Sequence, residues 1–347
     1  MVSAICQELA LQKDYLGGEP IATIYFGGGT PSLLSQHDLD LIFGEIFKRY
    51  PISAQPLEIT LEANPDDLTP QKLAALRQSP VNRLSIGIQS FSEADLRFMN
   101  RAHNAAEALA CIQNAQSTGF ENLTVDLIYG SPTTSHHQWE KNLETVIGLG
   151  VPHLSCYCLT VEPKTALAHQ IKKGAAPPMN DDHAATQFEH LLAQTERAGF
   201  EHYEISNFAL PGWHSRHNSS YWQGKKYVGI GPAAHSFDGA SRQWNVANNA
   251  QYIRSLDAGK VPFEREVLTP VQRYNEYVMT GLRTAWGCNL LKIRDLGFEM
   301  HFAQGVKMFL EDGTMERIGD IFRLTKSGKF LADGIAAELF AEGDGGL

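Results

Sequence analysis

Cysteine is scarce in this chain of 347 residues, which holds five cysteines at irregular spacing. No C-x-x-C pair occurs, and an odd, sparse set of cysteines is typical of a reducing compartment, not of a disulfide scaffold. Cys156 and Cys158 form a C-x-C within an apolar run, and we expect both to be buried on one face of a strand. A zinc or iron–sulfur site would need further ligands from elsewhere in the chain.

Long hydrophobic runs and positive charge are lacking as well. No stretch of about 18 apolar residues could span a bilayer, and the first residues do not show a basic region followed by an apolar stretch. The 29 Lys and Arg against 39 Asp and Glu give a net charge of −10, which argues against bulk binding to nucleic acid or to an anionic membrane. We therefore predict a cytoplasmic protein with no integral membrane segment and no nucleic-acid partner.

Apolar, β-rich runs alternate with amphipathic helical stretches from the start of the chain to about residue 206. The motifs Ser35-x-x-Asp38, Thr69-Pro70 and Ser92-x-x-Asp95 predict helix starts. Repeated alternation of strand and helix predicts βαβ units and a parallel sheet, either open and doubly wound or closed into a full or partial barrel. The predicted strands cover residues 21–26, 57–62, 83–88, 123–129, 154–160 and 201–206.

The pattern changes after residue 206. Residues 207–250 are rich in Asn, Gly, His, Ser and aromatic residues and show little periodicity. Beyond residue 268 we predict a mostly helical unit, with a helix over 271–283, a hairpin over 318–324 and a closing helix over 327–340. Helices with one small hairpin suggest a winged-helix-like module.

Each predicted strand ends in polar or glycine-rich residues, and the carboxyl ends of parallel strands are where ligands bind. Three glycines at 27–29 would allow close approach to the backbone, and the absence of a following Gly-Lys-Ser/Thr excludes a P-loop. Singly, Glu62, Gln89 and Asp126 fit loop caps or satisfied core groups. Together they would converge on one mouth that suits a ribose or an amino acid. Arg101 fits either a carboxylate clamp or a solvated charge at a helix end.

A second polar cluster covers residues 213–222 and combines two histidines, one arginine and three aromatic residues. Imidazole is a common ligand of haem iron and aromatic side chains suit a flat macrocycle, although a histidine among aromatics is more often simply packed. His235 is a weaker candidate of the same kind. The Gly229-x-Gly231 segment is not expected to be a dinucleotide fingerprint, because Pro232 interrupts the turn.

These motifs together resemble the radical S-adenosylmethionine enzymes of the coproporphyrinogen-III-oxidase-like family. The resemblance covers nearly the whole chain. Within that family, His217-Asn218-x-x-Tyr221-Trp222 followed by G-I-G-P at 229–232 is similar to the haem chaperone branch, whose H-N-x-x-Y-W motif is associated with haem binding. The other matching segments are Y-F-G-G-G-T-P-S at 25–32, E-A-N-P at 62–65, R-L-S-I-G-I-Q-S-F at 83–91, D-L-I-Y-G at 126–130 and L-T-V-E-P at 159–163.

The resemblance implies a partial (β/α)6 barrel over residues 1–250 and a small C-terminal domain over residues 251–347. It implies that His217 contacts haem and is the candidate ligand of its iron. It also implies a set of residues around S-adenosylmethionine: a glycine-rich turn at the amino-acid end of the cofactor, further polar residues along it and a threonine near its adenine. In this sequence they are Gly28, Gly29, Thr30, Glu62, Gln89, Arg101, Asp126 and Thr160.

One family feature is missing from the sequence. The family carries C-x-x-x-C-x-x-C after its first strand, where three thiolates hold a [4Fe–4S] cluster, whereas residues 1–22 here hold only Cys6. Residues 4–15 are predicted to form the helix that would follow the cluster loop. We therefore expect the first strand and the cluster only in a complete form of the protein, with truncation favoured over natural loss.

The leading hypothesis is a haem-binding chaperone that delivers haem to an acceptor haemoprotein such as a respiratory enzyme. The alternative is an oxygen-independent coproporphyrinogen III dehydrogenase, which carries out oxidative decarboxylation in porphyrin biosynthesis. A third hypothesis is an interaction protein that binds neither haem nor S-adenosylmethionine. Whether the chain is an enzyme, and whether it forms a homodimer, stay open at this point.

Overall fold

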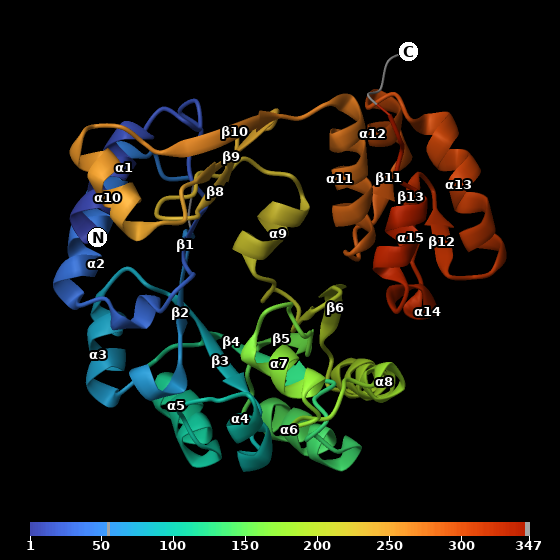
Figure 1. Cartoon of the computed structure of the whole chain (residues 1–347), viewed down its shortest axis with the longest axis horizontal. Helices are drawn as coiled ribbons and strands as arrows, with labels where there is room; N and C mark the ends of the chain where they lie inside the picture. The colour runs from blue at the N-terminus through green and yellow to red at the C-terminus, as the bar shows by residue number, and fades with distance from the viewer. Residues whose placement is uncertain (54–55, 344–347) are drawn as a thin grey trace. The chain divides into compact units, whose positions relative to one another are not determined.

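The computed structural model describes residues 1–53 and 56–343 (Figure 1), so the last four residues of the predicted C-terminal domain lie outside the described residues. The chain forms two compact units. The first consists of Met1–Thr23, Ser35–Leu57 and Arg216–Leu347, and the second of Ile24–Leu34 and Glu58–Ser215. The predicted division into residues 1–250 and 251–347 stays a sequence-based prediction.

The second unit is built on a seven-stranded sheet with the order β1-β2-β3-β4-β5-β7-β6. The ladders from β2 to β5 are parallel. The sheet curls into a half-barrel, which confirms the predicted partial barrel (Figure 1). The strands are β1 (Thr23–Phe26), β2 (Glu58–Ala63), β3 (Arg83–Gln89), β4 (Asn122–Tyr129), β5 (His153–Cys158), β6 (Glu201–Glu204) and β7 (Asn207–Ala209).

Alternating side chains give this sheet an apolar face and a polar face. Helices pack on the outer side of the sheet (Figure 1), and fully buried aliphatic side chains such as Leu84 and Val125 alternate there with inward polar ones. The parallel register aligns the inward residues Glu62 with Ser85, Ser85 with Thr124, and Asp126 with Ser155. The helices of this unit are α3 (Pro70–Gln78), α4 (Glu93–Phe98), α5 (Ala105–Ser117), α6 (His136–Gly148), α7 (Ala166–Lys172) and α8 (Asp181–Arg197).

The sixth predicted strand forms differently from the prediction. Residues 201–206 split into β6 and a tight turn, and β7 returns antiparallel to both β5 and β6. The Glu204 carboxylate stabilises the turn by accepting hydrogen bonds from the backbone N–H of Ser206 and the side-chain amide of Asn207. The new strand β7 therefore separates β5 from β6, which the period-two pattern alone could not show.

All three predicted helix starts are confirmed, because helices begin directly after Ser35, Thr69 and Ser92. Ser35 and Asp38 form a capping box at the start of α2 (Gln36–Arg49), and Thr69 accepts from the Lys72 backbone at the start of α3. At α4, Ser92 makes no side-chain cap. Asp95 instead points inward, where it accepts hydrogen bonds from Ser90 and Thr133.

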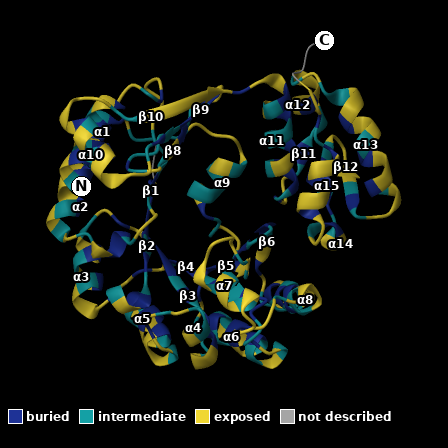
Figure 2. Cartoon of the chain, in the orientation of Figure 1, coloured by how far each residue is buried: buried dark blue, intermediate teal, exposed yellow. Residues whose placement is uncertain are grey.

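The first unit contains a three-stranded antiparallel sheet with the order β10-β9-β8, formed by β8 (His235–Phe237), β9 (Ser241–Asn245) and β10 (Phe263–Val267). The helices α1 (Val2–Leu11), α2 and α10 (Asn249–Asp257) belong to the same unit. Buried Glu8 joins three of these elements, because its carboxylate accepts hydrogen bonds from the Gly231 N–H, the Asn245 amide and the Tyr252 hydroxyl. Figure 2 shows that β10 is exposed along its length.

The C-terminal part of the first unit confirms the predicted helix and hairpin. The hairpin is β12 (Met315–Ile318) and β13 (Ile321–Leu324), and β13 also pairs with β11 (Cys288–Asn289). The closing helix is wrong as a single element, because a break near Phe330 divides it into two. The helices are α11 (Pro270–Leu282), α12 (Leu290–Asp295), α13 (Glu299–Glu311), α14 (Lys326–Lys329) and α15 (Ala332–Glu338). Among the residues that the structure describes, no helix is long and apolar enough to span a bilayer.

Candidate functional site

The glycine-rich turn after β1 is tied to Glu62 on β2. Gly28 and Gly29 have φ angles of 73° and 65°, which a residue with a side chain adopts only with strain. The Gly28 N–H donates to Glu62 Oε2 at 3.1 Å, and the Tyr25 hydroxyl donates to Glu62 Oε1 at 2.6 Å. Thr30 closes the turn as the residue before the short 3₁₀ helix Pro31–Leu33. The turn therefore presents backbone groups beside a fixed carboxylate.

Gln89 and Arg101 meet above Gly87 on β3. A Cβ atom on Gly87 would lie 2.9 Å from Gln89 Nε2 and 3.4 Å from Arg101 Nη2, so the absence of a side chain makes room for both groups. Arg101 Nη2 donates to Asn64 Oδ1 at 2.8 Å and to the Gly87 carbonyl at 3.0 Å, whereas its Nε is buried without a hydrogen-bond partner. Gln89 adopts a left-handed φ of 66°, the kind of local strain that collects at ligand sites.

Asp126 lies on the inner face of β4 between two serines. Ser85 Oγ lies 3.5 Å from each of its carboxylate oxygens, and Ser155, the register partner of Asp126 on β5, donates its hydroxyl to Asn207 Oδ1 at 3.0 Å. Burial, with a smaller contribution from the negative charge of Glu62, raises the pKa of Asp126 to about 7, although the serines oppose the shift. Asp126 and Glu62 are thus close enough to influence each other electrostatically.

The structure brings most of the predicted cofactor residues to one end of the half-barrel. Gly28 and Glu62 are in contact, Gln89 meets Arg101, and Asp126 and Glu62 share one face of the sheet. Thr160 follows β5 as an exposed residue. Carboxylates, an amide, a guanidinium and open backbone groups can together bind a ligand that carries ammonium, carboxylate and hydroxyl groups.

Several supporting residues were not predicted from the sequence. Tyr25 holds Glu62, Asn64 holds Arg101, and Ser85 and Ser155 flank Asp126. The signal available in the sequence was a polar residue at every second position of strands whose other residues are apolar. Such alternation predicts a polar inner face.

His217 lies in α9 (Arg216–Trp222) of the first unit. Its Nδ1 is 3.0 Å from Thr23 Oγ1, and its ring makes an edge contact with the Tyr221 ring, with centroids 5.0 Å apart. Burial lowers the pKa of His217 to about 4, so the imidazole is neutral at pH 7. In the tautomer with its proton on Nδ1, the ring would donate to the Thr23 hydroxyl and carry its lone pair on Nε2, which is the form that binds iron.

The remaining members of the 213–222 cluster divide between the two units. His214 belongs to the second unit, where it stacks on Tyr203 at 4.2 Å and lies 2.7 Å from Glu201. Tyr221 and Trp222 lie with His217 on α9. His235 is exposed on β8 with its ring 6.3 Å from Trp244.

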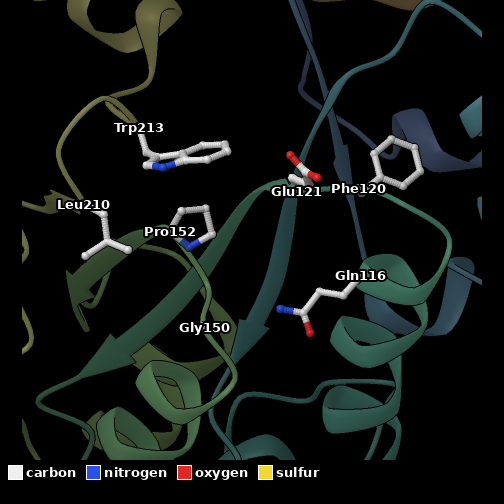
Figure 3. A pocket seen from close by; sticks show the side chains of 7 residues that line it. All are labelled: Gln116, Phe120, Glu121, Gly150, Pro152, Leu210 and Trp213. Carbon is white, nitrogen blue, oxygen red and sulfur yellow. The ribbon is translucent and has the colours of Figure 1, made fainter.

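An open pocket of about 390 Å³ lies at the other end of the strands (Figure 3). Glu121 precedes β4 and Pro152 precedes β5, whereas the candidate cofactor residues follow the opposite, carboxyl ends. The pocket is therefore separate from that site. Its lining residues are Gln116, Phe120, Glu121, Gly150, Pro152, Leu210 and Trp213.

The cysteines of this chain do not fit an iron–sulfur cluster. Cys111 and Cys288 are buried, and burial raises the pKa of each thiol to about 12. Cys156 is buried as predicted, but the expectation that Cys158 is a core residue is wrong, because β5 leaves the core at its end and exposes it. Within residues 1–53 and 56–343, no group of three His, Cys, Asp or Glu side chains is arranged for a metal ion.

Family models match both the N-terminal and the C-terminal part of the chain, and known relatives cover nearly all of it. The family model "Radical SAM superfamily" matches residues 6–146, and "HemN C-terminal domain" matches residues 268–331. The chain is 34% identical to the "Heme chaperone HemW" of Mycobacterium tuberculosis over 97% of this chain and 85% of that protein. It is 31% identical to the protein of the same name from Bacillus subtilis, over 98% and 91% of the two chains.

A solved structure has the same fold. The coproporphyrinogen III oxidase HemN of Escherichia coli, a radical SAM enzyme, superposes with a TM-score of 0.83. The match covers 98% of this chain and 82% of that chain, at 21% sequence identity. This likeness supports the half-barrel and the C-terminal domain as a fold.

Proposed function

The chain belongs to the HemW heme-chaperone family within the radical SAM superfamily, and we propose that it binds haem through His217 and delivers it to an acceptor haemoprotein such as a respiratory enzyme. The observation that carries this proposal is the state of His217. The side chain is neutral, oriented by Thr23 and flanked by the Tyr221 ring, as a haem ligand needs to be.

Membership of the radical SAM superfamily implies S-adenosylmethionine and a [4Fe–4S] cluster as cofactors of the family. In our proposal the Glu62 carboxylate binds the ammonium group of S-adenosylmethionine beside the backbone of Gly28, Gly29 and Thr30. Arg101, whose buried Nε has no hydrogen-bond partner, binds its carboxylate, with Gln89 and Asp126 at the ribose and Thr160 near the adenine.

The cysteines of this chain do not fit the [4Fe–4S] cluster. We expect it only in a form of the protein that carries C-x-x-x-C-x-x-C. For the residues of this chain the proposal is therefore confined to binding: orientation of S-adenosylmethionine by one unit and ligation of haem by His217 in the other.

The oxygen-independent oxidation of coproporphyrinogen III remains the alternative. It has the support of the shared fold, but HemN is only 21% identical, whereas the relatives at 31–34% identity over most of the chain carry the chaperone name. We further propose a cytoplasmic location and the division into domains at residues 1–250 and 251–347. A homodimer is the oligomeric state to test first.

Haem transfer distinguishes the chaperone from the enzyme. The haem-loaded chain is mixed with an excess of apo-myoglobin as a generic acceptor, and the Soret spectrum is followed over time. The chaperone role predicts transfer faster than from haem-loaded albumin, and the His217→Ala variant should hold too little haem to act as donor. Absence of haem binding by the wild-type chain would contradict the proposal. In parallel, decarboxylation of coproporphyrinogen III by a cluster-containing form would favour the enzyme.

A further inference from the structure

All the residues that line the open pocket at the amino ends of β4 and β5 belong to the second unit. They come from the end of α5, the loops that precede β4 and β5, and the turn after β7. Figure 3 shows the flat Trp213 ring above Pro152, extending toward the Glu121 carboxylate. The pocket therefore combines an aromatic face, an apolar floor and one negative charge.

A tight turn fixes the position of Trp213. Residues 210–213 read Leu-Pro-Gly-Trp, and the Trp213 N–H donates to the Leu210 carbonyl at 2.9 Å. Proline in the second position and glycine in the third, with a φ of 85°, are typical of a type II β-turn. The Leu210 N–H donates to the Pro152 carbonyl at 2.9 Å, which joins this turn to the loop before β5. The backbone thus positions the indole ring before any ligand binds.

The polar groups of the pocket are not used within the chain. The Glu121 side chain is exposed and makes no hydrogen bond or ion pair with any residue that the structure describes. The Trp213 ring likewise contacts no other ring or cation within residues 1–53 and 56–343. Gln116 Nε2 donates to the Leu149 carbonyl at 2.7 Å, which fixes the amide and leaves Oε1 available as an acceptor.

The nearest cation to be considered is Arg77 at the end of α3. Its Cζ lies 6.0 Å from the centroid of the Phe120 ring, which also lines the pocket. In the described part of the chain it makes no ion pair with Glu121. The charge of Glu121 therefore stays uncompensated within the chain.

An arginine side chain has the chemistry that these groups can recognise. A planar guanidinium can stack on an indole ring and still donate in its own plane to a carboxylate. Its five donors are enough for both Glu121 and Gln116 Oε1, and its aliphatic stem can cover Pro152 and Leu210. A lysine ammonium is compact and strongly hydrated, so it would gain less from the ring.

The shape and the charge of the molecule favour an arginine that belongs to a larger partner. Small-molecule sites usually enclose most of the surface of their ligand, whereas this pocket is open. A chain with a net charge of −10 also attracts a basic partner over a distance. Arginine and tryptophan are the residue types that often dominate the binding energy of protein interfaces.

We propose that the open pocket docks an arginine side chain that projects from an exposed segment of a partner protein, with the guanidinium between Trp213 and Glu121. This inference does not rest on haem binding, because His217 lies in the first unit and the pocket in the second. It also gives Trp213 a function apart from the histidines that follow it in the sequence.

Blocked tripeptides with a central arginine, citrulline or lysine test the proposal by NMR. The chain has five tryptophans, and Trp213→Phe identifies the indole N–H resonance of Trp213. The arginine peptide should shift this resonance with a dissociation constant of about 1 mM. Citrulline keeps the shape but not the charge, so its peptide should bind about tenfold more weakly. The lysine peptide should bind less tightly than the arginine peptide, and salt should weaken the binding of both.

Variants of the protein give the matching test. Glu121→Gln should weaken binding of the arginine peptide about tenfold, and Trp213→Leu, followed through the Gly150 amide resonance, should also weaken it. Glu144→Gln removes an exposed carboxylate from α6 of the same unit and should change nothing.

Three results would overturn the proposal. The first is equal binding of the arginine and citrulline peptides, or of the arginine peptide by wild type and Glu121→Gln. The second is an unshifted Trp213 resonance at about 10 mM arginine peptide. The third is tighter binding of free arginine than of the blocked peptide, because the pocket would then recognise the α-ammonium and α-carboxylate groups of a small molecule instead of a partner protein.

Discussion

The Tyr25 hydroxyl donates a hydrogen bond of 2.6 Å to Glu62 Oε1, while the other carboxylate oxygen accepts from the Gly28 backbone. Burial and the adjacent Glu62 carboxylate raise the pKa of Tyr25, so the phenol keeps its proton and acts as a donor. One donor from β1 and one from the turn that follows it thus fix the orientation of a carboxylate on the neighbouring strand before any ligand binds. Such preorganisation is what an ammonium-binding site requires.

Substitution Glu62→Gln should weaken binding of S-adenosylmethionine about tenfold or more. The amide keeps the shape of the side chain but loses the negative charge that would pair with the ammonium group. Equilibrium dialysis with labelled S-adenosylmethionine measures the effect, and Glu189→Gln, an exposed position on α8 of the same unit, is the matched control. Equal affinity in Glu62→Gln and wild type would remove Glu62 from the site.

Asp126 should make the stability of the protein depend on pH. Its pKa is raised from 3.8 to about 7 in the folded protein, so the native state holds a proton that the unfolded state has lost. The stabilisation from Asp126 is therefore fully present below about pH 4 and is lost as the pH rises through about 7. Asp126→Asn should remove this dependence and raise the free energy of unfolding at pH 8 by about 2 kcal/mol.

Urea denaturation between pH 5 and 8 measures the effect. The control is Asp257→Asn, which changes an exposed carboxylate at the end of α10 and should leave the pH profile of the wild type. A profile for Asp126→Asn that runs parallel to that of the wild type would show that Asp126 is charged in the native state at pH 5.

Among the polar residues of the first unit, Glu8 should be the one whose replacement lowers the free energy of unfolding most. Replacement by alanine leaves buried donors of Gly231, Asn245 and Tyr252 without an acceptor, and should cost about 3 kcal/mol or more in the free energy of unfolding. Tyr252→Phe removes one donor and should cost about 1–2 kcal/mol. Chemical denaturation is the measurement, with Glu264→Ala on exposed β10 as control. A cost below 1 kcal/mol for Glu8→Ala would be incompatible with this network.

Haem affinity should be nearly constant between pH 8 and pH 5.5. Because burial lowers the pKa of His217 to about 4, the imidazole stays neutral over this range and does not lose its ligand lone pair to protonation. An exposed histidine, with a pKa near 6.5, would lose affinity through the same range. Spectroscopic titrations at several pH values distinguish the two cases, and a sigmoidal loss centred near pH 6.5 would indicate another ligand.

The different periods of strands and helices were sufficient to predict a parallel α/β sheet, and the resemblance to a known family was needed to predict the partial barrel. The glycine turn, Glu62, Gln89 and Asp126 each follow or end a parallel strand, and parallel strands bring such residues together. The features that the sequence did not predict are local ones. The strand β7 arises from a turn stabilised by Glu204, and Asp95 points inward because Ser90 and Thr133 donate to it. Both depend on partners that no periodic pattern specifies.

The surroundings of His217 were less accessible to prediction from the sequence. The sequence placed Trp213 to Trp222 in one cluster, but the chain passes from one compact unit to the other between Ser215 and Arg216. The contact of His217 with Thr23 joins residues 194 positions apart. The pairing of Arg283 with Trp222 likewise depends on tertiary structure.

The central claim is that His217 ligates haem iron. The direct test is titration of ferric haem into the wild-type chain, His217→Ala and His235→Ala, with the Soret band recorded at each step. We predict that the wild type and His235→Ala give the same shifted band and the same affinity, and that His217→Ala loses the shift and binds at least tenfold more weakly. An unchanged band and affinity in His217→Ala would contradict the account.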